Sequence, residues 1–316
     1  MKFIHGVAHM RGLLHLGRIS RILVKHGFGD LIDRLFREDS AATTAPEETE
    51  LALKSGFPSP RRIRRVLEEL GPSFIKLGQL MSTRADIFPP EYIEELSKLQ
   101  DSVPPVPFEA IRAVLEREFK RPLADIFKSF EPESMAAASV AQVHAALLHS
   151  GEKVAVKVIR PGIEKKIRED IRLMYYFAQK LEKKVEMGRK IGFVNLAREF
   201  ERTIFKELDM LTEAGHMERF SGYFAKSSEL HIPQVYWGHT TKSVLVMEHI
   251  DGIKMDQVDT IRSHGIDPKE VALIGLRSFS RQLMDFGLFH ADPHPGNTIV
   301  MYDGRVSLVD FGIMGY

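Results

Sequence analysis

The sequence predicts a two-lobed α+β protein that carries an N-terminal helical extension. Helical patterns fill the chain up to about residue 119, and a strand-like hairpin follows after residue 130. Long helical segments then separate this hairpin from short strands around a polar loop near the C-terminus. Strands, then helices, then strands are typical of the α+β class. A chain of 316 residues has room for one large or two small domains.

Composition excludes several classes of function. The formal net charge of +1 argues against a nucleic-acid-binding protein, and 44% hydrophobic with 28% charged residues is ordinary for a globular chain. The chain has no cysteine, which excludes disulfides, thiolate metal sites and a cysteine nucleophile. No run of eighteen apolar residues occurs, so a membrane-spanning helix is not expected.

Residues 1–37 form a basic amphipathic segment. Its basic side chains fall within roughly a quarter of a helix circumference, at Arg11, Arg18, Arg21 and Lys25. Apolar side chains gather on the other side, at Leu13, Leu16, Ile19, Leu23 and Val24. Such a helix can lie on an anionic membrane surface. The alternatives are a helix that docks on the protein with a solvated basic face, and a transit-like peptide, which the shortage of serine disfavours.

Helices are expected along much of the remaining chain. The polar segment 38–60 is typical of a linker. Patterns punctuated by Gly-Pro and Pro-Pro pairs then predict helices at 61–70, 72–85, 90–100 and 107–119. Longer patterns predict helices at about 162–187, 192–226 and 268–287.

Strands are expected in three places. SVAQVHAAL and KVAVKVI, joined by a turn at 149–152, predict an antiparallel hairpin. HIPQVYWG and SVLVMEHI predict a second strand pair, and TIVMY and VSLVDF predict short strands after the polar loop. Alternation along the second strand of the hairpin sends Val154, Val156 and Val158 to the core and Lys157 to the opposite side.

Three polar residues near the C-terminus carry the chemistry. Asp292 in HADPHPGN is followed five residues later by Asn297, and thirteen residues further on by Asp310 of an Asp-Phe-Gly sequence. Phosphoryl transfer depends on positioning and charge neutralisation. Asp292 is suited to accept the acceptor's proton or to orient a water, while Asn297 and Asp310 offer the hard oxygen ligands that magnesium prefers. The paired motifs therefore predict a site for a magnesium nucleotide, ATP or ADP.

Lys157 lies where such a site needs a cation. A lysine on a strand, at the point where a hairpin leads into a helix, is typical of the residue that binds nucleotide phosphates. The alternative is an ordinary lysine on the protein surface. Glu207 and Glu213 both qualify as its carboxylate partner, and Glu213 is preferred. An alanine-rich stretch replaces the usual glycine-rich phosphate loop, at Ala136, Ala137, Ala138, Ser139, Val140, Ala141 and Gln142. Its Cβ atoms restrict the backbone, so its phosphate contacts should differ from those of a glycine loop.

One face of the helix expected at 72–85 is polar among apolar neighbours. Lys76, Gln79 and Thr83 share this face because they lie three and seven residues apart. From the residues alone, side chains that reach out to water are the better interpretation.

From Arg61 to its last residue, the sequence resembles the UbiB family of atypical protein-kinase-like proteins, which includes the mitochondrial and chloroplast ADCK proteins. The resemblance rests on FIKLGQLMSTR, AAASVAQVH, VAVKVIRPG, FKELDMLTEA, HADPHPGN and DFG. It implies a protein-kinase-like fold whose helical extension lies over the active site. The family-specific site residues that it implies are Lys76, Gln79, Glu207 and Asp209. By position, Met247 corresponds to the residue before the hinge, and the hinge that meets adenine corresponds to Glu248, His249 and Ile250.

The resemblance also implies a function. It indicates an ATPase or phosphotransferase of isoprenoid-quinone (ubiquinone) biosynthesis, with ATP or ADP and Mg²⁺ as cofactors. The implied partners are a membrane lipid or quinone intermediate and quinone-biosynthesis proteins. The implied location is peripheral, on the cytoplasmic face of the inner membrane if the protein is bacterial.

This chain departs from the family pattern at three points. Ala141 stands where the family commonly has glycine, and Ala291 replaces the arginine of ordinary kinases, as is usual for the family. The chain ends at Tyr316, just after DFG, so a fragment with an incomplete C-lobe is expected. The expected organisation is a basic segment, a linker, a helical extension, an N-lobe with a helical insertion and the start of a C-lobe, at 1–37, 38–60, 61–128, 129–250 and 251–316.

Two rival functions fit parts of the pattern. A small-molecule kinase of the aminoglycoside or choline phosphotransferase kind also has an HxDxxxxN loop, but the Lys76-Leu77-Gly78-Gln79 helix argues against it. A nucleotide-gated module that binds lipid or protein without catalysis is the other rival, and the incomplete C-lobe favours it.

Overall fold

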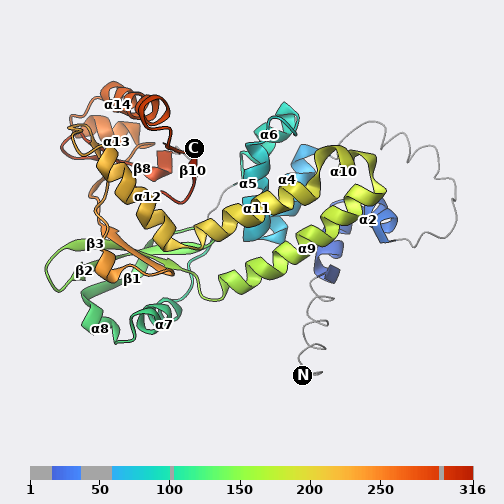
Figure 1. The fold of residues 1–316 in the computed structure, drawn as a ribbon, viewed down its shortest axis with the longest axis horizontal. Coiled ribbons are helices and arrows are strands. Elements are labelled where there is room, and N and C mark those ends of the chain that lie inside the picture. Colours follow the sequence, from blue (N-terminus) through green and yellow to red (C-terminus); the bar gives the residue numbers. More distant parts are fainter. Residues whose placement is uncertain (1–15, 37–58, 100–102, 292–294, 316) are drawn as a thin grey trace. The chain divides into compact units, whose positions relative to one another are not determined.

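The computed structural model describes residues 16–36, 59–99, 103–291 and 295–315 (Figure 1). The chain divides into two compact units, one made of 1–103 with 162–202 and the other of 104–161 with 203–316. Helices and strands are both present, so the expected α+β class is confirmed. Arg11, Leu13, nearly all of the expected linker and Asp292 lie outside the described residues. Within the described ranges, no helix is long and apolar enough to cross a bilayer.

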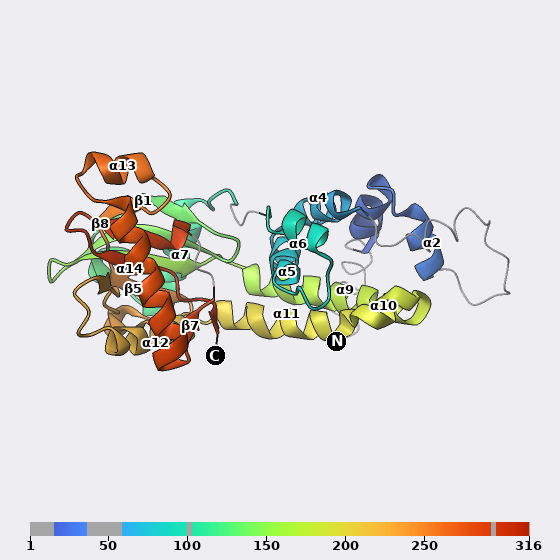
Figure 2. The same cartoon turned by 90° about the horizontal axis from the view of Figure 1, so that it is seen from above.

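The first unit is helical. Besides a helix over 16–25, it contains α2 (Gly29–Phe36), α4 (Pro60–Leu70), α5 (Pro72–Ser82), α6 (Pro90–Leu96), α9 (Ile163–Lys184), α10 (Glu186–Ile191) and most of α11 (Phe193–Glu207). Helices α4, α5 and α6 pack on one another, and α5 also contacts α9 (Figure 2). Gly78 permits this packing, because a Cβ at that position would lie 2.3 Å from Leu99 Cδ1 and 2.7 Å from Leu67 Cδ1.

The apolar side of the basic N-terminal helix packs inside this unit. Ile19 and Ile22 are buried, and Ile22 shares a small core with Val66 of α4. Lys25 Nζ and His26 Nε2 both lie 2.8 Å from the Glu69 carboxylate, at the end of α4. The described part of this helix therefore favours the docking alternative, in which the basic face stays exposed.

The second unit is built around a four-stranded antiparallel sheet of order β1-β2-β3-β5. Its strands are β1 (Phe127–Ala137), β2 (Ala141–Leu148), β3 (Lys153–Ile159) and β5 (Val244–Glu248). The helices α7 (Phe108–Phe119) and α8 (Leu123–Ile126) supply apolar side chains to a core that includes Val154, Val156 and Val158 of β3. The expected alternation of β3 is thus confirmed, and Lys157 lies on the opposite face of the sheet.

The long helix expected at 192–226 is two helices. It breaks after α11, which ends at Glu207, and α12 covers Met210–Tyr223. Asp209 adopts an extended conformation, and its carboxylate accepts a hydrogen bond from Leu211 N at 3.1 Å. An aspartate that caps a helix in this way marks a helix start, which explains the break.

The expected pairing of HIPQVYWG with SVLVMEHI is confined to a short antiparallel contact. The two segments meet at one isolated bridge, between Val235 and Met247, while β5 pairs with β3. The first segment begins at His231, the second residue of the strand β4 (Leu230–His231), which pairs in parallel with β9. Pro233 lies two residues after the end of β4, and proline cannot donate a ladder hydrogen bond.

A second four-stranded sheet, of order β4-β9-β8-β6, carries the segments near the C-terminus. Its other strands are β6 (Gly252–Lys254), β8 (Thr298–Met301) and β9 (Val306–Leu308). The remaining elements of this region are α13 (Val258–Ser263), α14 (Pro268–Arg281), a π-helix (Gln282–Phe286), β7 (Phe289–His290), a 3-10 helix (Pro295–Asn297) and β10 (Met314–Gly315). Asn297 directly precedes β8 and Asp310 follows β9, so the β8–β9 hairpin brings their chain segments together.

The buried His144 predicts that this fold loses stability in acid. It is fully buried, its Nδ1 donates to Glu131 O at 2.9 Å, and its Nε2 accepts from the Gln142 amide at 2.8 Å. Burial lowers the pKa of His144, although the bond to Glu131 opposes the shift. Because an unfolded chain then binds the proton more readily, the free energy of unfolding should fall between about pH 7 and pH 5. Denaturant titrations should show a smaller pH dependence in His144→Gln and an unchanged one in the exposed-site control His149→Gln.

Candidate active site

Lys157 stands between two carboxylates in the second unit. Its Nζ lies 2.7 Å from Glu213 Oε1 and 3.0 Å from Glu213 Oε2, and 3.2 Å from Asp310 Oδ1. The Lys157 and Glu213 side chains are 12% and 4% exposed, whereas that of Asp310 is 42% exposed. One end of this cluster is therefore buried in the protein, and the Asp310 end is open to a ligand.

Helix α12 brings Glu213 to Lys157. Its first residue is Met210, so Glu213 lies at the end of the first turn and is almost fully buried. Asp209 caps the same helix, and Glu207 ends the preceding one. Of the two glutamates that sequence reasoning left open, Glu213 is the one whose carboxylate reaches Lys157.

The charges of this cluster suit a cation. Burial alone would lower the pKa of Lys157, but Asp310 and Glu213 outweigh it and raise that pKa, so the ammonium is charged at neutral pH. Burial raises the pKa of the Glu213 carboxyl, although the Lys157 ammonium opposes the shift. Two carboxylates around one ammonium leave an excess of negative charge beside the exposed Asp310. A magnesium ion with its nucleotide would balance that charge.

Asn297 and Asp310 lie on neighbouring chain segments. The Asn297 carbonyl accepts from Val309 N, the residue before Asp310, at 3.0 Å. Asp310 Oδ1 also accepts from Gly312 N at 3.0 Å, and the Asp310 carbonyl contacts His290 Nε2. Residues whose side chains offer oxygen ligands to magnesium are thus held close together. Asp292 is outside the described residues, so its role stays a prediction.

The alanine-rich stretch covers the end of β1, the connection at 138–140 and the start of β2. Ala138 N donates to Ala141 O at 2.9 Å, which closes a tight turn. Ser139 is 2% exposed, and its hydroxyl has no partner among the described residues. A buried hydroxyl without a partner is costly. A ligand oxygen at this turn would satisfy the Ser139 hydroxyl, and this observation fits a bound phosphate.

The segment expected to be the hinge follows β5. Met247 is buried in β5, on the same side of the sheet as Lys157. The backbone N–H groups of Glu248 and His249 donate to Gln234 O at 2.8 Å and to Lys153 O at 3.2 Å. These two amides are therefore engaged inside the protein, and an adenine ring would have to use other backbone groups of the expected hinge.

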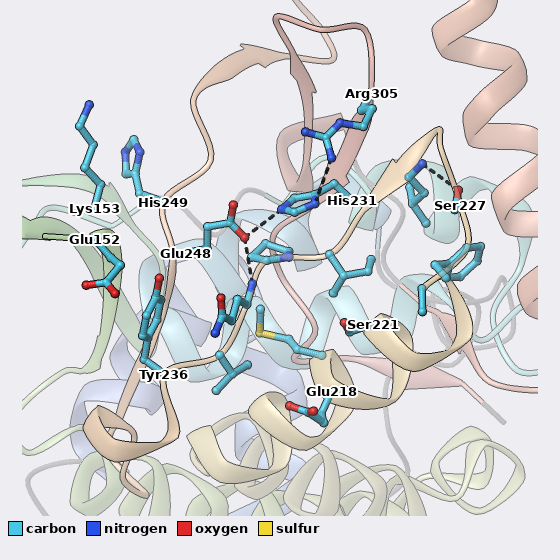
Figure 3. Close-up of a pocket in the computed structure, with 18 residues that line it drawn as sticks. Glu152, Lys153, Glu218, Ser221, Ser227, His231, Tyr236, Glu248, His249 and Arg305 are labelled. Atoms are coloured by element: carbon cyan, nitrogen blue, oxygen red, sulfur yellow. Dashed lines mark hydrogen bonds and ion pairs between the residues drawn. The ribbon is translucent and has the colours of Figure 1, made fainter. Parts of the chain in front are cut away.

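A cavity of about 820 Å³ lies in the second unit, beside α12 and the segment 225–236 (Figure 3). Glu248 and His249 line it, together with Tyr236 and Arg305. Figure 3 shows the Glu248 carboxylate facing His231, whose Nε2 lies 2.9 Å away. Its lining includes none of the residues of the Lys157 cluster. The cavity is thus distinct from the candidate phosphate site, although Glu248 and α12 border it.

Lys76 and Gln79 belong to α5, in the first unit. Both side chains are half-buried, as expected for side chains that reach out to water from among apolar neighbours. Gln79 Nε2 donates to Leu99 O at 3.2 Å and so ties α5 to the segment that follows α6. A role of Lys76 and Gln79 at the nucleotide site stays a prediction.

Sequence reasoning missed two residues of α12 that contact the Asp-Phe-Gly segment. His216 Nδ1 lies 3.0 Å from Phe311 O, and the rings of Phe220 and Phe311 are 5.3 Å apart between centroids. Their spacing from Glu213, three and seven residues, places all three on one face of the helix. This spacing is the sequence signal by which the two residues could have been predicted.

The comparisons agree with this geometry. Residues 98–316 match a family model described as the ABC1 atypical kinase-like domain. A probable protein kinase UbiB of Marinobacter nauticus is 43% identical over 268 residues, which cover 82% of this chain and 49% of that protein. The protein ACTIVITY OF BC1 COMPLEX KINASE 7, chloroplastic, of Arabidopsis thaliana is 39% identical over 253 residues, which cover 80% of this chain and 36% of that protein. The chain thus spans half or less of the length of these two relatives.

A solved structure has a related fold. It is that of Rv3197 from Mycobacterium tuberculosis in complex with erythromycin. The TM-score is 0.52 at 28% sequence identity, and the match covers 85% of this chain and 66% of that one.

Proposed function

This chain belongs to the ABC1 atypical kinase-like family, which includes UbiB, and on that premise we propose that it binds a magnesium nucleotide and acts on the γ-phosphoryl group. The reaction is ATP hydrolysis or phosphoryl transfer, in isoprenoid-quinone biosynthesis at a membrane. The observation that carries the proposal is the position of Lys157 between Glu213 and Asp310, at 2.7 and 3.2 Å. A buried, charged lysine next to an exposed carboxylate offers one group to phosphate and the other to magnesium.

Each residue of the site has a task in this proposal. Lys157 binds the phosphates, and Glu213 fixes the direction of its ammonium. Asp310 and Asn297 hold magnesium, which, when bound, neutralises charge on the phosphates. The Ser139 hydroxyl and the backbone of the alanine-rich turn bind phosphate oxygens. Asp292 accepts the proton of the acceptor or orients a water.

The proposal includes a membrane partner. The basic residues Arg18, Arg21 and Lys25 are exposed, while Ile19 and Ile22 on the apolar side of their helix are buried in the protein. This helix would therefore bind an anionic membrane surface through its charges rather than by inserting apolar side chains. Its affinity for that surface would fall as the salt concentration rises. A lipid or a quinone intermediate at that surface is the proposed substrate or activator.

Calorimetric titration with ATP and with ADP, with and without magnesium, tests the nucleotide site. We expect magnesium to tighten binding to the unchanged chain, and Asp310→Asn to weaken the magnesium-dependent binding on the order of tenfold or more. Asp303→Asn is the matched control, because Asp303 is an exposed aspartate in the turn between β8 and β9 and pairs with Arg305. A folded chain that binds neither nucleotide would overturn the proposal.

Two further assays separate the rival functions. Phosphate release stimulated by lipid vesicles supports an ATPase, whereas intact nucleotide binding without any release supports a nucleotide-gated binding module. Phosphorylation of added choline or of an aminoglycoside would instead support a small-molecule kinase.

A further inference from the structure

Both backbone polar groups of Phe311 are bonded to side chains of α12. Its N–H donates to Glu213 Oε1 at 3.4 Å, and its carbonyl accepts from His216 Nδ1 at 3.0 Å. Phe311 is the residue directly after Asp310. These two bonds therefore constrain the backbone from which the Asp310 carboxylate projects.

Packing reinforces the same constraint. Phe311 is fully buried, and its ring meets that of Phe220 edge to face at 5.3 Å. The His290 ring lies 5.7 Å away on another segment, and its Nε2 contacts the Asp310 carbonyl. The segment that carries Asp310 is thus held by α12 and by His290 together.

The protonation state of His216 follows from its partner. A carbonyl oxygen can only accept, so His216 Nδ1 carries the proton in this contact. Burial lowers the pKa of His216, although the bond to Phe311 opposes the shift. The imidazole is therefore a neutral donor at neutral pH, with its Nδ1–H directed at Phe311 O.

We infer that His216 is a positioning residue, which holds Asp310 in the orientation that binds magnesium by donating to the Phe311 carbonyl. The inference rests on the proposed function, because it requires that Asp310 bind magnesium together with a nucleotide. A histidine with a merely structural role would change stability, or would change nucleotide affinity equally with and without magnesium. Replacing a positioning residue changes only the part of the nucleotide affinity that depends on magnesium.

The test compares His216→Leu with His216→Asn in the full chain. Asparagine can place its Nδ2–H₂ close to the position of the histidine Nδ1–H, whereas leucine fills the space without a donor. The measurement is the ratio of the ATP dissociation constants without and with magnesium, with circular dichroism as the check on folding. His216→Leu should reduce this ratio about tenfold, and His216→Asn should keep it within about twofold. His239→Leu is the matched control, since His239 is another half-buried histidine of the same unit whose pKa burial lowers.

Each outcome decides between the inference and its premise. No magnesium dependence in the unchanged chain would overturn the proposed function and this inference with it. Magnesium dependence that His216→Leu leaves intact, or an equal loss with and without magnesium, would overturn this inference alone. If His216→Leu does not fold, the tautomer of His216 in the unchanged chain is measured instead from its ring ¹⁵N NMR signals, which are assigned by their disappearance in His216→Asn. The inference requires the Nδ1–H tautomer, and the Nε2–H tautomer would overturn it.

Discussion

Replacing Glu213 by alanine should lower the free energy of unfolding by about 3 kcal/mol, because it removes one partner of a buried ion pair. Lys157 would keep Asp310 as its remaining carboxylate neighbour, at 3.2 Å. The ammonium would then turn toward Asp310 and away from the phosphates, so nucleotide affinity should also fall, on the order of tenfold or more. Denaturant unfolding and calorimetric titration with ATP measure the two effects.

Two comparisons isolate the ion pair from the rest of the helix. Glu218→Ala removes an exposed glutamate of the same helix, whose carboxylate accepts from the Trp237 indole at 3.0 Å, and should change stability by no more than about 0.5 kcal/mol. A double-mutant cycle with Lys157→Met and Glu213→Gln measures the coupling of the pair. Additive effects in that cycle would contradict the assigned pairing.

Replacing Phe311 by alanine should cost about 4 kcal/mol of stability, because it leaves a cavity where a fully buried ring contacts Phe220. The Asp310 segment would lose its main apolar contact with α12. We therefore expect the magnesium dependence of ATP binding to fall together with the denaturation midpoint. Thermal unfolding monitored by circular dichroism, followed by ATP titration with and without magnesium, measures both.

Phe311→Leu refines this prediction. Leucine keeps most of the buried apolar surface, so its cost should be less than half that of alanine and the chain should still fold. Tyr302→Ala serves as the control, because Tyr302 is 60% exposed in the turn between β8 and β9. A Phe311→Ala chain as stable as the Tyr302→Ala chain would show that the ring is not packed as described.

Local patterns predicted most of the fold. The alternation of Val154, Val156 and Val158 defined the buried face of β3, because successive strand residues point to opposite sides of a sheet. The partners of the strands did not follow from such patterns. Strand β5 pairs with β3 across more than eighty intervening residues, and β4 pairs with β9. Pairing of this kind depends on how the whole chain folds back, which a local pattern does not contain.

The sequence by itself determined the chemical groups of this protein and the family to which it belongs. The types and spacing of Lys157, Asn297 and Asp310 suffice to identify both. Few kinds of chemistry need a lysine on a strand together with an amide and a carboxylate that lie thirteen residues apart, as Asn297 and Asp310 do. Only the tertiary structure decided that Glu213 rather than Glu207 reaches Lys157, since the break at Asp209 sets the rotation of α12. It also revealed the contact between His216 and Phe311. Residues 95 positions apart come together there only through the packing of α12 against the Asp-Phe-Gly segment.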